Sequence, residues 1–62
     1  MKLTAETITD AQIRALMGAR PFHGATYTTA RVALGERRPF PSMSRATARG
    51  RCAEILNARS GT

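Results

Sequence analysis

The spacing of the large apolar residues is the feature that most constrains how this chain can fold. About fourteen occur in 62 residues, and never more than two stand together, as in Leu16-Met17 and Ile55-Leu56. No segment alternates apolar and polar residues over a useful length, as a half-buried strand would. No apolar run is long enough to cross a membrane, and the N-terminus lacks the pattern of a secretory signal. The sequence therefore predicts a small all-α protein of the cytoplasm, with no membrane-spanning segment.

The clearest predicted helix covers residues 10–18. Thr9 and Gln12 have the spacing of a capping box, in which each side chain accepts a hydrogen bond from the other residue's backbone amide. Ile8 and Ile13 stand on either side of this cap, at the positions of a hydrophobic staple. These signals together predict where the helix begins and which face it buries.

Prolines and glycines divide the rest of the chain. Residues 19–27 contain both without a lasting period, which predicts a loop. A short helix is predicted over 29–35, with Thr28 as its cap. Two prolines then make residues 36–43 an extended, stiff and basic connector. A longer helix is predicted over 45–59.

We expect one small domain over residues 1–62, with two short helices and a longer C-terminal helix. Residues 1–7 carry little periodic signal, and their structure is left open between a flexible arm and an anchored segment. Because large apolar side chains are few, we also expect Phe22 and Tyr27 to be buried. The predicted core consists of eight residues on helix faces: Ile13, Leu16, Met17, Val32, Leu34, Cys52, Ile55 and Leu56.

Surplus positive charge is the main indication of function. Ten Lys and Arg against four Asp and Glu give a net charge of +6, and the second half of the chain holds most of the excess. Arg45 is predicted in the first turn of its helix, where the helix dipole disfavours a cation by about 0.3–1 kcal/mol. An anion bound beside Arg45 would reverse this cost. The predicted contact residues for nucleic acid or an acidic partner are Arg37, Arg38, Ser42, Ser44, Arg45 and Arg49.

Phe40 lies between two prolines of the connector. It is expected either in the core or as an exposed anchor for a partner. The alternative for the arginines is a solvated surface that binds nothing specific.

Catalysis and metal binding lack the residues they need. The single Cys52 cannot form an internal disulfide and is predicted to be a small buried hydrophobe. His23 is predicted at the surface, and no third group would orient a Cys52–His23 pair for nucleophilic chemistry. We expect no enzymatic activity, no metal and no other cofactor.

The spacing of the predicted helices argues against a helix-turn-helix. This motif needs a turn of three or four residues, whereas about ten residues separate each pair of neighbouring predicted helices.

Three blocks of this sequence, residues 8–16, 33–35 and 48–59, resemble a type of small open reading frame. Over about half of its length the chain is similar to the short helical proteins of bacterial phages, prophages and plasmids. This resemblance implies a mobile-element setting in the cytoplasm and brings no catalytic residues with it.

We therefore expect a non-enzymatic binding protein whose Arg-rich face docks on nucleic acid, in a regulatory or DNA-binding role. By analogy with phage proteins, the alternative is an inhibitor of a host defence system, of the anti-CRISPR kind, bound to an acidic protein or nucleoprotein surface. Self-association as a homodimer, or folding on a partner, would supplement the small core.

Overall fold

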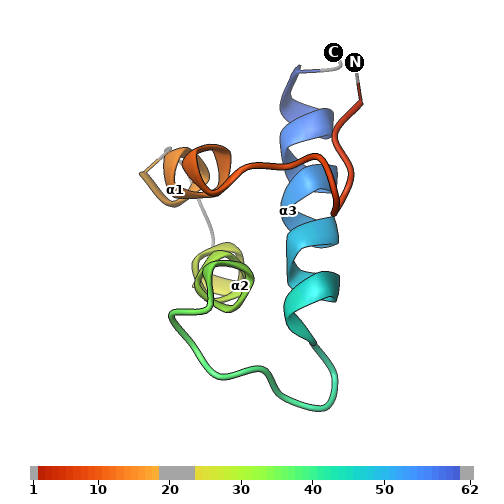
Figure 1. Ribbon diagram of the computed structural model, residues 1–62. Helices are drawn as coiled ribbons and strands as arrows, with labels where there is room; N and C mark the ends of the chain where they lie inside the picture. Colours follow the sequence, from red (N-terminus) through yellow and green to blue (C-terminus); the bar gives the residue numbers. More distant parts are fainter. Residues whose placement is uncertain (1, 19–23, 61–62) are drawn as a thin grey trace.

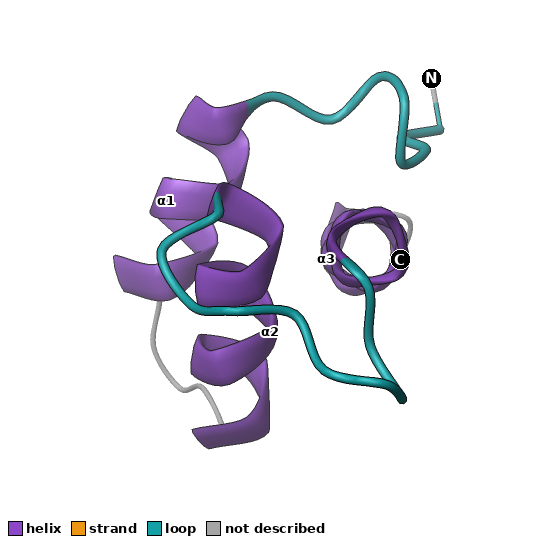
Figure 2. Cartoon of the chain, turned by 60° about the horizontal axis from the view of Figure 1, so that its bottom comes forward, coloured by secondary structure: helices purple, strands orange, loops and turns teal. Residues whose placement is uncertain are grey.

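The computed structural model describes residues 2–18 and 24–60, and three helices make up most of this part of the chain (Figure 1). They are α1 (Asp10–Gly18), α2 (Gly24–Leu34) and α3 (Arg45–Ser60). Figure 1 shows α1 and α2 end-on beside α3, and Figure 2 shows α3 end-on beside the other two, so that α3 runs crosswise to the pair. No strand occurs in the described ranges, and the predicted all-α fold with a longer C-terminal helix is confirmed.

The start of α1 confirms the predicted cap. The Thr9 amide donates to Gln12 Oε1 at 2.9 Å, and the Gln12 amide donates to Thr9 Oγ1 at 3.2 Å. Ile8 and Ile13, at the staple positions, are both buried. Local side chains thus satisfy two amides at the helix entry that would otherwise lack partners.

The predicted bounds of the second helix are wrong at its beginning, because α2 starts at Gly24 rather than residue 29. Thr28 is therefore an interior helix residue and not a cap. Residues 29, 30, 32 and 33 form the buried face of the helix, and burial of this face stabilises a segment whose own helix propensity is weak.

The end of α2 follows the prediction. Gly35 has a φ of 80°, the left-handed conformation that favours glycine. The Gly35 amide donates to the Val32 carbonyl at 3.0 Å, and the Glu36 amide donates to the Arg31 carbonyl at 2.8 Å. This pair of bonds is a Schellman motif, which fixes the direction in which the connector leaves the helix.

The connector ends in a tight turn before α3. Phe40 and Met43 exchange two backbone hydrogen bonds, of 2.8 and 3.3 Å, and Met43 is buried. Ser44 caps α3, because its Oγ accepts a hydrogen bond from the Thr47 amide at 3.2 Å. Ser42 lies exposed in the turn. The ten positions 35–44 separate α2 from α3, which is longer than the three or four residues of a helix-turn-helix turn.

Four of the eight predicted core residues have almost no exposed surface, namely Ile13, Leu16, Val32 and Cys52. The other four, which are Met17, Leu34, Ile55 and Leu56, are partly buried and pack against this cluster. The core also contains the staple residue Ile8, together with Met43 and four alanines that are not among the eight predicted core residues. Small side chains at the helix contacts allow the backbones to approach closely.

The prediction that Tyr27 is buried is wrong, because Tyr27 is 41 % exposed. The predictions for Phe22 and His23 concern residues outside the described ranges.

The N-terminal segment is anchored to α3. The Leu3 amide donates to Asn57 Oδ1 and the Asn57 side-chain amide donates to the Leu3 carbonyl, both at 2.9 Å. Leu3 also packs against the core cluster. Of the two alternatives left open for this segment, these contacts favour the anchored one.

Candidate functional site

Arg49, one of the predicted contact residues, is directed into the molecule. Its Nη1 donates to Asp10 Oδ1 at 2.8 Å and to the Ala33 carbonyl at 3.3 Å, while its Nη2 donates to the Ile8 carbonyl at 2.7 Å. Only 20 % of its side chain is exposed. A single guanidinium therefore joins the entry of α1, the last turn of α2 and the first half of α3.

This contact also changes the titration of Asp10. The hydrogen bond from Arg49 is the largest cause lowering the pKa of the Asp10 carboxyl below its usual 3.8, and the charges of Arg49, Arg45 and Arg14 act in the same direction. Partial desolvation opposes them. The charged form of Asp10 is thus the form that the fold favours.

Arg45 also has a partner within the protein. Its Nε donates to the Ala33 carbonyl at 3.1 Å, and its guanidinium carbon lies 3.5 Å from the position that a Cβ on Gly35 would occupy. The carbonyls at the end of a helix carry partial negative charge. The end of α2 therefore offsets the cost of placing a cation in the first turn of α3, which the sequence analysis assigned to an external anion.

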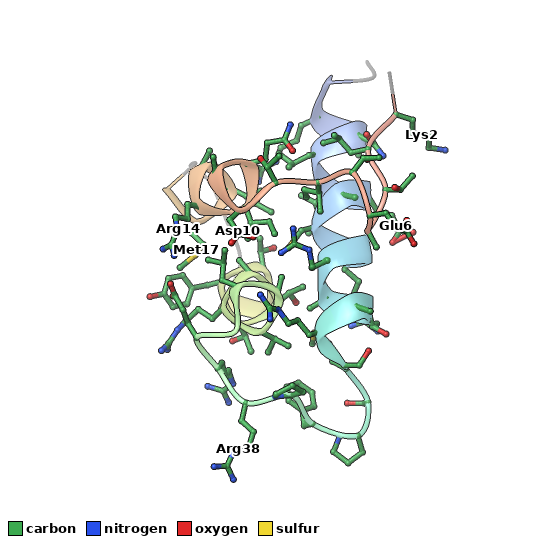
Figure 3. All side chains as sticks on the ribbon, in the orientation of Figure 1. Lys2, Glu6, Asp10, Arg14, Met17 and Arg38 are labelled. Carbon is green, nitrogen blue, oxygen red and sulfur yellow. The ribbon has the colours of Figure 1, made fainter. Side chains whose placement is uncertain are left out.

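The other predicted contact residues lie on the outside. Arg37, Arg38 and Ser42 are exposed, and Arg38 points away from the helices (Figure 3). Within residues 2–18 and 24–60, no carboxylate forms an ion pair with Arg37 or Arg38. Phe40 is 36 % exposed, which leaves part of its ring accessible beside these arginines. Of the four predicted arginines, Arg37 and Arg38 are exposed, Arg45 is exposed but also donates to the Ala33 carbonyl, and Arg49 is directed inward.

Two residues outside the predicted contact set, Tyr27 and Arg31, lie on the helix that leads into the connector with Arg37 and Arg38. The Arg31 guanidinium lies over the Tyr27 ring, with its central carbon 5.9 Å from the ring centroid. Arg31 Nη2 is 3.5 Å from the Glu36 carbonyl, and the Arg37 amide donates to the Arg31 carbonyl at 3.2 Å. These contacts link Tyr27, Arg31 and Arg37, and Arg38 follows Arg37 in the chain. We call these four residues the aromatic-basic surface.

The aromatic-basic surface carries net positive charge. Its three arginines have Glu36 as the neighbouring acid, but Glu36 is already paired with Arg14 of α1 at 2.9 Å. The excess charge is therefore +3 for this small region. The signal that could have identified it is the four-residue spacing of Tyr27 and Arg31, which places them on one face only if both are helical.

A shallow groove of about 340 Å³ between α2 and α3 is a weaker candidate for a site. It is lined by Thr26, Thr29, Arg51, Glu54 and Ile55. Its walls hold one cation and one carboxylate, so it has no excess charge to attract an anion.

The residues described here provide no cluster of three or more side chains able to hold a metal. Cys52 is fully buried, and burial raises the pKa of its thiol. This environment suits a packing residue rather than a nucleophile.

Comparison with known proteins adds no relative from which a function could be transferred. The chain matches no model of a protein family, no curated protein and no solved structure. None of the helices in the described ranges is long and apolar enough to span a membrane. The geometry of the aromatic-basic surface is therefore the basis for assigning a function.

Proposed function

We propose that this chain is a non-enzymatic, nucleic-acid-binding protein of the mobile-element type that its sequence resembles, and that the aromatic-basic surface contacts the ligand. The observation that carries the proposal is the exposure of Arg37 and Arg38 beside Tyr27 and Arg31, while the nearest acid, Glu36, is paired with Arg14.

Arginine is well suited to this role, because its planar guanidinium can bond two phosphate oxygens at once. The backbone on both sides of Arg37 and Arg38 is held, by the Schellman motif before them and by the Phe40–Met43 turn after them. A held backbone reduces the conformational entropy that binding would otherwise cost. The net charge of +6 adds long-range attraction to any polyanion.

The double variant Arg37→Ala/Arg38→Ala tests the proposal. Each lost phosphate contact lowers the slope of log affinity against log salt by about 0.7 for single strands and 0.9 for duplex DNA. We therefore expect a slope smaller by about 1.4 to 1.8, with the affinity loss greatest at low salt. Fluorescence anisotropy of labelled oligonucleotides at several salt concentrations measures both quantities.

The matched control is Lys2→Ala/Arg51→Ala, which removes the same charge from exposed positions outside the aromatic-basic surface. This variant should bind more weakly than wild type only through the lower overall charge, with a smaller change in slope. Equal slopes for the two double variants would contradict a localised contact. Wild-type protein that fails to bind any oligonucleotide at low salt would end the proposal.

The second candidate is an inhibitor that docks on an acidic protein surface. The exposed part of Phe40, next to Arg37 and Arg38, favours it as an apolar anchor. Such a complex would persist at moderate salt and after nuclease treatment, and Phe40→Ala would disrupt it. Nucleic-acid binding predicts instead a complex that weakens steeply as salt rises and that is lost after nuclease treatment.

A further inference from the structure

We infer that the nucleic acid is single-stranded and that an unpaired base stacks on the ring of Tyr27. The inference rests on the proposed function and makes its ligand more specific. Its basis is an exposed aromatic ring with the Arg31 guanidinium over it, on the helix that leads into the connector with Arg37 and Arg38.

The ring of Tyr27 is placed in advance for such a contact. Tyr27 is 41 % exposed although the chain has only three aromatic residues and few large apolar ones to fill its core. The Arg31 guanidinium lies over the ring, 5.9 Å from its centroid, and Arg31 Nη2 is 3.5 Å from the Glu36 carbonyl. A ring and a guanidinium held together offer a stacking surface and a phosphate contact within one turn of helix.

Stacking on this ring requires a base whose face is open. In a duplex, the neighbouring base pairs cover both faces of each base, so that a ring on the outside of α2 has no face to meet. In a single strand the bases can splay out and stack on aromatic side chains.

The helix ends provide a second argument against duplex recognition. Proteins that read the major groove present side chains from the start of a recognition helix. At the start of α3, Arg45 and Arg49 instead turn back to the carbonyl of Ala33. The exposed Tyr27, Arg37 and Arg38 lie instead on α2 and the connector.

Tyr27 is the only tyrosine, and the chain has no tryptophan. Intrinsic protein fluorescence therefore reports on this ring alone. Titration with an unlabelled single-stranded oligonucleotide should quench the fluorescence, with free N-acetyltyrosinamide as the correction for absorbance by the nucleotide. The duplex of the same sequence should quench it little.

Three variants separate stacking from charge. Tyr27→Leu should lower the affinity for the single strand about 5- to 150-fold, which is the range for loss of one stacked base. Tyr27→Phe, which keeps the ring, should bind as wild type does. Neither change should alter duplex binding, and circular dichroism should show unchanged helix content in both, because Tyr27 is exposed.

The outcomes distinguish the inference from the proposed function. If Arg37→Ala/Arg38→Ala weakens binding but Tyr27→Leu and strand state make no difference, single-strand stacking is refuted and nucleic-acid binding stands. If the arginine variant matches its control, both fail. Tighter binding to an acidic polypeptide than to any oligonucleotide would also refute both and favour the protein partner.

Discussion

Removal of the Arg49 guanidinium should destabilise the protein more than removal of any other positive charge in the described structure. Arg49→Met keeps much of the aliphatic stem but removes the donors to the Ile8 and Ala33 carbonyls. Hydrogen bonds from charged donors contribute about 1.5–3 kcal/mol each. Water can solvate the carbonyls in part, so we take the lower value and expect a loss of about 3 kcal/mol. The ion pair with Asp10 contributes little, because that carboxylate is solvent-exposed.

A loss of this size is large for the chain. Stabilities of about 0.05–0.15 kcal/mol per residue give about 3–9 kcal/mol for 62 residues. Urea unfolding followed by circular dichroism would measure the change, with Arg51→Met as the control on the same helix. Because Arg51 is exposed, its variant should lie within about 0.5 kcal/mol of wild type. If Arg49→Met were as stable as Arg51→Met, the three contacts of Arg49 would not hold the helices together.

Two further tests address backbone conformation and pH. Gly35→Ala should destabilise the fold by about 1–2 kcal/mol, because φ is 80° there. Gly50→Ala should stabilise α3 by up to about 1 kcal/mol, since the new Cβ would lie 3.8 Å from that of Ala5 in ordinary contact; urea melts compare both variants with wild type. Folding lowers the pKa of the Asp10 carboxyl. The ionised carboxylate therefore contributes to the free energy of unfolding above the unfolded pKa near 3.8, and this contribution is lost as pH falls through the lower pKa of the folded state. Asp10→Asn should remove this part of the acid dependence, which unfolding at about pH 6 and about pH 2.5 would measure.

The elements that could be predicted from sequence are those whose signals are local. The Thr9–Gln12 cap and the Gly35 helix end depend on residues within a few positions of each other, and both form as expected. The start of α2 depends instead on long-range contacts. Its buried face meets α1 and α3, and this packing extends a helix through Gly24, which locally resembles a loop signal.

The candidate site also divides into residues with local determinants and residues with long-range ones. Exposure of Arg37 and Arg38 follows from their place on a proline-rich connector, so both could be predicted as contact residues. The roles of Arg45 and Arg49 could not be predicted, since their acceptors are backbone carbonyls at Ile8 and Ala33. A backbone carbonyl occurs at every residue, so no sequence pattern marks the one that an arginine will find.

The two groups of arginines should therefore affect binding in different ways. Arg49 holds Ala33, two residues before the Schellman glycine from which the connector departs, so its loss would reduce the fraction of folded protein. The apparent affinity then falls in proportion to that fraction, but the phosphate contacts of the folded molecules are unchanged. When affinity is corrected for the folded fraction at each salt concentration, Arg49→Met should keep the wild-type salt slope, whereas Arg37→Ala/Arg38→Ala should lower it. A reduced slope in Arg49→Met would place its guanidinium on the ligand and contradict its inward position.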